Sequence, residues 1–346
     1  MIKETIAKLV LGKDLNFEET KEVFEEIFDH KLTPAQIASF LTALKIKGEK
    51  EAEILAAATV IRSRAIKIKL SAGFLEGVEK GPLIDTCGTG GSGLNKFNIS
   101  TAVSFVVAAG GVGVAKHGNK AMSSSCGSAD VLEALGINIT ASPLTMEQAL
   151  KKIGMAFLYA PLYHPALKEV AGIRREMGIR TIFNILGPLC NPAGADYQLL
   201  GVYRQELVTC LAKVLKQLGL KRAIVIYSQD LKDEISLSGK TQAAFLNNHK
   251  ITALTLSAAS FGLKKVAVRD LLVKDARESA EVIRKVLEGK KGAPRDVVLA
   301  NASACFYILG KAHDFKQGVS LAAQLIDCGK AKAKYIEFKD FLKSHA

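Results

Sequence analysis

The most constraining feature of this sequence is a change of hydrophobic rhythm near residue 80. Beyond that point, short apolar runs alternate with longer segments whose apolar residues recur at helical spacing. This alternation is typical of a parallel sheet whose strands are joined by crossover helices. The expected strands are residues 83–86, 112–115, 156–159, 198–202 and 223–227. The expected helices of this part are residues 100–109, 129–135, 146–153, 206–218, 276–287, 294–309 and 315–328.

The first seventy residues show a different pattern, with consecutive short segments of helical periodicity. The expected helices are residues 4–11, 17–30, 34–47 and 49–66. Asn16 and Thr33 are the expected N-caps of the second and third helices. In the third helix the apolar residues fall on one face, which indicates packing against a core rather than contact with a cofactor. These residues are Ile37, Phe40, Leu41 and Leu44.

Together the two patterns predict an α/β fold with two parts. Residues 1–70 are expected to form a small helical subdomain. Residues 71–346 are expected to form a larger domain with a mostly parallel central sheet flanked by helices. Residues 164–187 have a helical pattern again, so we expect this segment to return to the helical subdomain. A chain of 346 residues is long enough for two such parts.

The charge of the chain indicates an anionic partner. The sequence has 47 Lys and Arg against 34 Asp and Glu, a net charge of +13, but the basic residues are dispersed rather than gathered in one run. A polyanionic small molecule therefore fits as well as nucleic acid does.

Neither the cysteines nor the N-terminal segment indicates export. The six cysteines include no CxxC pair and no zinc-ligand spacing, as expected of reduced thiols. The segment MIKETIAKLVLGKDL mixes charged and apolar residues and lacks the uninterrupted apolar core of a secretory signal. The longest apolar stretch, residues 101–115, is too short to span a bilayer and is interrupted by glycines. We expect a cytoplasmic protein with no membrane partner.

A glycine-rich segment, IDTCGTGGSGLNKFNIST, follows the first expected strand of the sheet. Its glycines allow backbone amides to approach phosphate oxygens, and the helix that starts near Asn98 adds further amides and a positive dipole. The glycines are Gly88, Gly90, Gly91 and Gly93. Asn98, Ser100 and Thr101 add a carboxamide and two hydroxyls, which either bind phosphate or magnesium or cap the helix.

A second polar loop, within VAKHGNKAMSSSCGSADVLEALG, follows the second expected strand. Such a loop lies at the carboxyl end of a parallel strand, where ligands of open α/β sheets bind. Lys116 at the strand end can offer a positive charge to phosphate, and Ser123, Ser124 and Ser128 can offer hydroxyl donors. On its own this could be a surface loop, but beside the glycine-rich segment it indicates a polyanion site.

With these two segments, the blocks HPALKEVAGIRREMGIRTIFNILGPLCNPA and DEISL make the chain resemble the anthranilate phosphoribosyltransferases. The motifs stand in the order and at the spacing of that family and cover most of the chain. The resemblance implies transfer of the phosphoribosyl group from phosphoribosyl pyrophosphate to anthranilate, the second step of tryptophan synthesis from chorismate. It also implies the nucleoside phosphorylase/phosphoribosyltransferase-like fold, magnesium (Mg2+) as cofactor, and a homodimer formed through the helical subdomain.

The resemblance further implies roles for individual residues. Those implied to bind phosphoribosyl pyrophosphate are Gly88, Gly91, Ser92, Lys96, Asn98, Ile99, Ser100, Thr101, Lys116, His117, Gly118, Asn119, Ser123, Ser124 and Ser128. Those implied to bind anthranilate are Gly88, Asn119, His164 and Arg174. Those implied to serve magnesium are Ser100, Asp233 and Glu234. No nucleophile or base is assigned, since the amine of anthranilate is already nucleophilic, and a general-base role for His117 or His164 stays a hypothesis.

Four positions depart from the pattern common in that family. The chain has Ser92 where Asp is usual, Lys96 where a hydroxyl residue is common, Lys120 where Arg is common, and Ser125 where Lys is usual. The changes at Ser92 and Lys96 make the glycine-rich segment less acidic, whereas the change at Ser125 removes a positive charge from the second polar loop.

Two alternatives to the transferase remain open from the sequence. A pyrimidine nucleoside phosphorylase-like enzyme would share the fold and a similar glycine-rich loop, but it would lack the HPALKEVAGIRREMG block. A nucleic-acid-binding paralogue without transferase activity would suit the basic charge and the altered loop. It would not need Asn119, Arg174, Asp233 or Glu234, so we expect no nucleic-acid partner.

Overall fold

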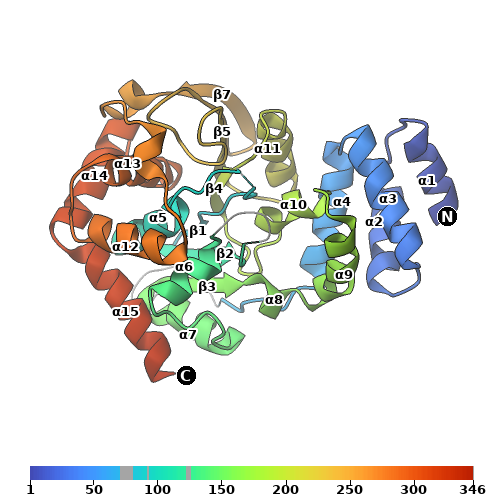
Figure 1. The fold of residues 1–346 in the computed structure, drawn as a ribbon, viewed down its shortest axis with the longest axis horizontal. Helices are drawn as coiled ribbons and strands as arrows, with labels where there is room; N and C mark the ends of the chain where they lie inside the picture. Colours follow the sequence, from blue (N-terminus) through green and yellow to red (C-terminus); the bar gives the residue numbers. More distant parts are fainter. Residues whose placement is uncertain (71–80, 92, 122–125, 346) are drawn as a thin grey trace.

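The computed structural model describes residues 1–70, 81–91, 93–121 and 126–345, which form a helical part beside a larger α/β part (Figure 1). The helical part begins with α1 (Ile2–Val10), α2 (Phe17–Phe28), α3 (Pro34–Lys47) and α4 (Glu51–Ser63). The side chains of Asn16 and Thr33 accept hydrogen bonds from the backbone at the starts of α2 and α3, which confirms both predicted N-caps. No helix of the described residues is long and apolar enough to cross a membrane.

A seven-stranded sheet, in the order β3-β2-β1-β4-β5-β6-β7, forms the centre of the α/β part. Its strands are β1 (Leu83–Asp85), β2 (Gly113–Gly118), β3 (Met155–Tyr159), β4 (Tyr197–Gly201), β5 (Arg222–Ser228), β6 (Thr241–Asn247) and β7 (Lys250–Leu256). The five strands predicted from the sequence are present and pair in parallel. The mostly parallel sheet is thus confirmed.

The sequence did not predict the antiparallel hairpin of β6 and β7 at one edge of the sheet. Its turn uses Asn248 and His249, which both adopt positive φ angles of 44° and 72°, without the Asn-Gly or Asp-Gly pair that usually marks such turns. Most residues of β7 are exposed, so this edge strand carries little hydrophobic pattern.

Helices cover both faces of the sheet (Figure 1). They are α5 (Ile99–Ala109), α6 (Ser128–Ala134), α7 (Pro143–Ile153), α11 (Leu207–Gln217), α12 (Ala276–Leu287), α13 (Ala293–Ile308), α14 (Phe315–Asp327) and α15 (Lys330–Ser344). Helix α5 packs against α13 and α15 on one face, whereas α11 packs against β5 and β6 on the other. All except α15 were predicted to within three residues; α15 follows Gly329 and is rich in lysine, so its apolar face is narrow.

The central segment contacts the N-terminal helices. It comprises α8 (Ala160–Tyr163), η1 (Pro165–Leu167), α9 (Lys168–Met177), α10 (Phe183–Leu186) and η2 (Gly187–Leu189); two further short 3-10 helices, η3 (Ala258–Phe261) and η4 (Val268–Leu271), lie in the α/β part. Helix α9 contacts α3, and α10 contacts α4. These contacts bring α9 and α10 beside the helices of the N-terminal segment.

Alternate residues of β5 belong to two different hydrophobic cores. Ala223 and Val225 pack in the core that includes the N-terminal helices, α9, α10 and α11. Ile224 and Ile226 pack in the core that includes α5 and α13. Successive side chains of a strand point to opposite faces, so this alternation places helices on both sides of the sheet. Because the first core is continuous, packing fixes α9 and α10 relative to the strand ends.

Candidate active site

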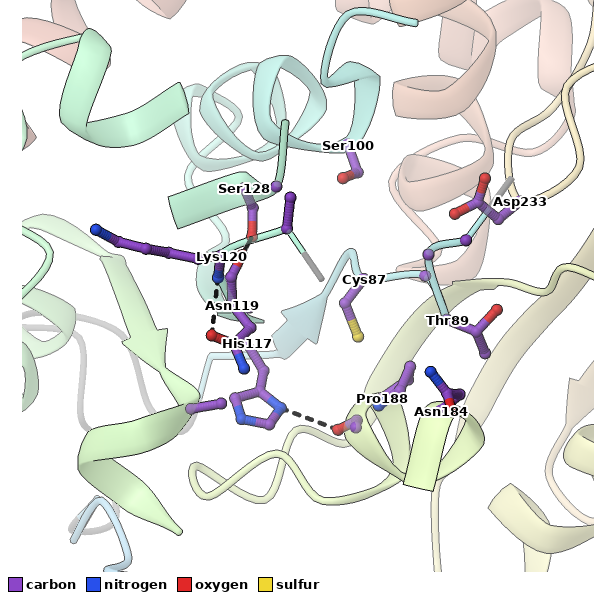
Figure 2. A pocket seen from close by; sticks show the side chains of 18 of the residues that line it. Cys87, Thr89, Ser100, His117, Asn119, Lys120, Ser128, Asn184, Pro188 and Asp233 are labelled. Carbon is purple, nitrogen blue, oxygen red and sulfur yellow. Dashed lines mark hydrogen bonds between the residues drawn. The ribbon is translucent and has the colours of Figure 1, made fainter. Parts of the chain in front are cut away.

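A cavity of about 290 Å³ lies at the carboxyl ends of β1 and β2 and extends to α9 and α10. It is lined by residues from both parts of the chain. The described residues predicted for binding that line it are Gly88, Gly91, Lys96, Asn98, Ser100, Lys116, His117, Gly118, Asn119, Ser128, His164, Arg174, Asp233 and Glu234. Figure 2 shows Ser100 and Asp233 at one end and His117 and Asn184 at the other.

Seven predicted or singled-out residues do not belong to that set. Ile99 and Thr101 are buried and do not line the cavity; Thr101 Oγ1 bonds to Asn98 Oδ1 instead. Four positions lie outside the described residues, namely Ser92, Ser123, Ser124 and Ser125. Lys120 lines the cavity by its position, but its ammonium pairs with Glu133 at 2.9 Å and points away from the centre (Figure 2).

The glycine-rich segment, which lines the cavity, is hydrogen-bonded to the neighbouring strand β4. Gly88 forms a parallel bridge with Gly201, and the amide of Thr89 donates to the Gly201 carbonyl at 2.8 Å. Gly91 adopts a φ of +72°, and a Cβ there would lie 2.7 Å from Nη2 of Arg180. Only glycine suits this position, because the backbone is left-handed and the arginine packs against it.

Arg180 is a cavity residue that the sequence analysis did not single out. Its Nη2 donates to the carbonyl of Gly91, and its guanidinium lies 4.9 Å from the centre of the Tyr203 ring. It therefore holds the glycine-rich segment against the segment after α9. The signal was present, since the arginine belongs to the IRTIFN block, but the contact joins residues 89 positions apart and no local pattern predicts it.

Lys116 places a buried positive charge beneath the start of α5. Its side chain is 2 % exposed, and its Nζ donates to the Thr86 carbonyl at 2.8 Å and to Ser100 Oγ at 3.0 Å. Burial lowers the pKa of Lys116, and the nearby Asp85 carboxyl opposes that shift. Asn98 caps α5 by accepting a bond from the Thr101 amide at 3.2 Å, so backbone amides and one ammonium meet at this end of the cavity.

Asp233 and Glu234 lie on the loop after β5 and also line the cavity. Burial raises the pKa of the Glu234 carboxyl to about 7, while Lys96 opposes the shift. Asp233 Oδ1 forms an ion pair of 2.5 Å with Lys96 Nζ. These side chains come from segments 137 positions apart, and no local sequence pattern predicts that they pair.

The residues of this end have the chemistry that magnesium needs. Ser100, Asp233 and Glu234 offer only oxygen atoms, and they also line a small second void together with Asn301. Magnesium is usually held by one or two carboxylates, with waters and substrate phosphates completing the coordination. The described residues contain no group of three or more His, Cys, Asp or Glu that could hold a metal, so phosphate oxygens would have to contribute.

His117 and His164 form a buried pair with ring centres 5.1 Å apart. His117 Nδ1 lies 3.0 Å from the carbonyl oxygen of Gly187, which can only accept, so Nδ1 carries the proton and Nε2 is an acceptor. Burial lowers the pKa of His117 to about 3 and that of His164 to about 4. Both rings are therefore neutral at pH 7.

His117 and His164 are expected to contribute a rise in the free energy of unfolding with pH between about 4 and 6.5, while the raised pKa of Glu234 acts in the opposite direction. An unfolded histidine titrates near pH 6.5, whereas the folded pKa values of His117 and His164 are about 3 and 4. The unfolded chain therefore binds more protons in this window, and each histidine adds at most about 1.4 kcal/mol per pH unit. Urea unfolding across the window measures the slope. His164→Asn should make the slope less positive, and His313→Asn, at an exposed position, is the control. An unchanged slope in His164→Asn contradicts the prediction.

The end of the cavity near α9 and α10 suits a small aromatic acid. Arg174 on α9 lies with its guanidinium 5.2 Å from the centre of the Phe183 ring, and burial lowers its pKa. Leu186 and Pro188 add apolar surface to the lining. An arginine can bind a carboxylate through two hydrogen bonds, and the apolar walls can hold a ring. Asn119, at the end of β2, faces the same cavity (Figure 2).

The chain is similar in sequence to known proteins over nearly its full length. Residues 3–65 match the helical bundle domain of a glycosyl transferase family, and residues 80–332 match the a/b domain of that family. An anthranilate phosphoribosyltransferase of Geobacter sulfurreducens is 50% identical over 343 residues, covering 97% of this chain and 98% of the relative. One of Acetivibrio thermocellus is 46% identical and covers 99% of this chain and 97% of its own length.

Solved structures show the same similarity. The anthranilate phosphoribosyltransferase of Thermus thermophilus matches with a TM-score of 0.88 at 38% identity, covering 98% of this chain and 99% of that one. The enzyme of Saccharomyces cerevisiae in complex with PRPP and Mg matches with a TM-score of 0.87 at 26% identity, covering 99% of this chain and 98% of that one. The same yeast enzyme has also been solved in complex with 4-fluoroanthranilate.

Proposed function

Because the chain belongs to the anthranilate phosphoribosyltransferase family, we propose a division of its cavity between the two substrates. The protein is a pentosyltransferase that joins anthranilate to the ribose of phosphoribosyl pyrophosphate and releases pyrophosphate, a step of tryptophan synthesis. The donor binds at the strand ends, along the glycine-rich segment, the start of α5 and Lys116. Anthranilate binds at the end formed by Arg174 and Phe183.

The observation that best supports this division is that the two ends of one cavity differ in their chemistry. At one end, the buried Lys116 ammonium and the amides at the start of α5 suit pyrophosphate. At the other end, Arg174 beside the Phe183 ring suits a benzoate. The anomeric carbon of a donor held at the first end would then face the amine of an acceptor held at the second.

The reaction replaces the bond from the anomeric carbon to pyrophosphate by a bond to the amine of anthranilate. Its transition state has oxocarbenium character, so the site must mainly stabilise the departing pyrophosphate. Lys116 and the backbone amides supply fixed positive charge for this. We propose that Ser100, Asp233 and Glu234 hold magnesium, which when bound neutralises part of the pyrophosphate charge. Positioning of the neutral amine by Asn119 and Arg174 accounts for much of the remaining rate, since orientation alone is worth about 7–11 kcal/mol in ideal cases.

We also propose a homodimer formed through the helical subdomain, comprising residues 1–70 with 164–187, and a cytoplasmic location. The support for the dimer is a set of large apolar side chains at the surface of α1, just after it, and on α3. Val10, Leu11 and Ile46 are 72%, 71% and 82% exposed. Such exposed apolar residues are a usual mark of an interface between copies.

Loss of anthranilate fluorescence on mixing the protein with phosphoribosyl pyrophosphate and magnesium tests the proposed function. We expect turnover that depends on both substrates. A folded protein that releases bases from pyrimidine nucleosides with phosphate, or that binds DNA or RNA with steep salt dependence, and shows no transfer, would contradict it.

Arg174→Ala is expected to lower kcat/KM for anthranilate by about 10- to 100-fold, because a hydrogen bond to a charged group contributes about 1.5–3 kcal/mol. The KM for the donor should stay within about twofold, since Arg174 lies on the acceptor side. Steady-state kinetics at saturating donor measure the effect. Arg175→Ala is the matched control, because Arg175 is exposed and does not line the cavity. Equal losses in the two variants would contradict the assignment.

A further inference from the structure

The Lys96 ammonium is paired with Asp233, which is one of the two carboxylates proposed above to hold magnesium. Lys96 Nζ lies 2.5 Å from Asp233 Oδ1 and 2.7 Å from the carbonyl oxygen of Leu231. The two side chains are only 10% and 11% exposed, and both line the cavity. Ion pairs of this kind are short and strong, because both partners are charged and water is largely excluded.

The backbone on both sides holds this ion pair in place. Lys96 forms an antiparallel bridge with Leu272, and the amides of Phe97 and Val273 complete it, donating to Leu271 O at 3.0 Å and Asn95 O at 2.7 Å. The pair is therefore anchored in the fold and is not a chance contact between two mobile surface side chains.

Asp233 is held just as closely. The backbone of Asp233 packs so tightly on Gly201 that a Cβ on that glycine would overlap its carbonyl oxygen. The Asp233 carboxylate also lies against Gly88, where a Cβ would be 3.0 Å from Oδ2. The carboxylate therefore has little freedom to turn away from Lys96.

The Asp233 carboxylate is already paired with a cation without a metal. Its partner is the Lys96 ammonium, and the Lys116 ammonium also lies at this end of the cavity. A divalent cation approaching Asp233 Oδ1 would have to displace the ammonium, because magnesium needs its ligand oxygens at about 2.0–2.1 Å. It would also meet two fixed positive charges.

We propose that the Lys96 ammonium, through its ion pair with the Asp233 carboxylate, competes with divalent cations for that carboxylate. Divalent cations therefore bind it weakly until a donor pyrophosphate supplies further oxygens. The inference rests on the proposed function, because it concerns the metal-binding end of the same cavity. Lys96 thereby sets how much magnesium the free protein binds. A lysine that only stabilised the loop would leave metal affinity unchanged.

Binding of Mn2+, used as the probe and followed by electron paramagnetic resonance, tests this on the full chain without any donor. Lys96→Gln and Lys96→Thr should each bind Mn2+ at least about 10-fold more tightly than the parent. Lys96→Arg, which keeps the charge, should bind as weakly as the parent. Adding Asp233→Asn to Lys96→Gln should remove the gain.

The matched control is Lys232→Gln, which removes the same charge one residue from Asp233. The Lys232 ammonium points elsewhere, donating to the carbonyl of Gln229 at 2.9 Å, so the affinity should change less than about twofold. The proposal is overturned if folded Lys96→Gln and Lys96→Thr bind Mn2+ no more tightly than the parent, or if Lys232→Gln gains as much. Mn2+ binding does not involve anthranilate, so failure here is separate from absence of transfer in the fluorescence assay.

Discussion

Gly201→Ala is expected to lower kcat/KM for both substrates by at least about 100-fold. Gly201 ends β4 and bridges Gly88, and a Cβ there would overlap the backbone of Asp233. The loop that carries Asp233 and Glu234 must therefore move away from the glycine-rich segment. A displacement of about 1 Å at a reacting site can cost 10²-fold in rate. Steady-state kinetics with thermal unfolding as the check on folding measure the effect.

Gly172→Ala is the matched control for that substitution. Gly172 lies within α9, and a Cβ there meets nothing within 4 Å. Alanine in a helix interior is favoured over glycine by about 0.5–1 kcal/mol, so this variant should keep its activity and gain stability. If Gly201→Ala keeps parental kinetics, the loop after β5 does not need its position against β4, and the proposed metal-binding role of that loop fails.

The parts of this fold that could be predicted from the sequence are those specified by neighbouring residues. The caps Asn16 and Thr33 and the five parallel strands follow from local pattern, and the structure confirms them. The hairpin of β6 and β7 could not be predicted in this way, because an exposed edge strand needs few apolar residues and its turn contains no glycine.

The candidate site shows the same limit. The glycine-rich segment and the residues after β2 were predicted to lie together because the carboxyl ends of parallel strands meet at one edge. The contacts of Arg180 with Gly91 and of Lys96 with Asp233 join residues 89 and 137 positions apart. Such pairs depend on how the helical part and the loop after β5 pack on the strand ends, which no local pattern contains. Lys96 stood out in the sequence as a departure from a family pattern and as a residue of the donor-binding segment, but not as a partner of Asp233.

Lys116→Met is expected to lower kcat by about 10²- to 10³-fold. The ammonium is buried at the proposed donor end of the cavity, where it donates to Ser100 Oγ and the Thr86 carbonyl. A preorganised donor that stabilises charge in a transition state typically contributes about 2.7–4 kcal/mol, and burial excludes the water that could replace it. Single-turnover measurements at saturating donor and anthranilate report this loss directly.

The control for Lys116→Met is Lys120→Met, four residues further along, where the ammonium is exposed and pairs with Glu133. It should retain kcat within about twofold, because a surface ion pair contributes about 1 kcal/mol or less to stability and does not face the pyrophosphate.

Lys116→Met should also unfold at a lower temperature, since the buried Asp85 loses a neighbouring positive charge. Asp85 keeps hydrogen bonds from Asn191 Nδ2 at 2.8 Å and the His117 amide at 3.2 Å, so we expect the variant to fold. Lower stability with unchanged kcat would mean that Lys116 supports the fold alone, and the donor charge would then have to be neutralised by other groups.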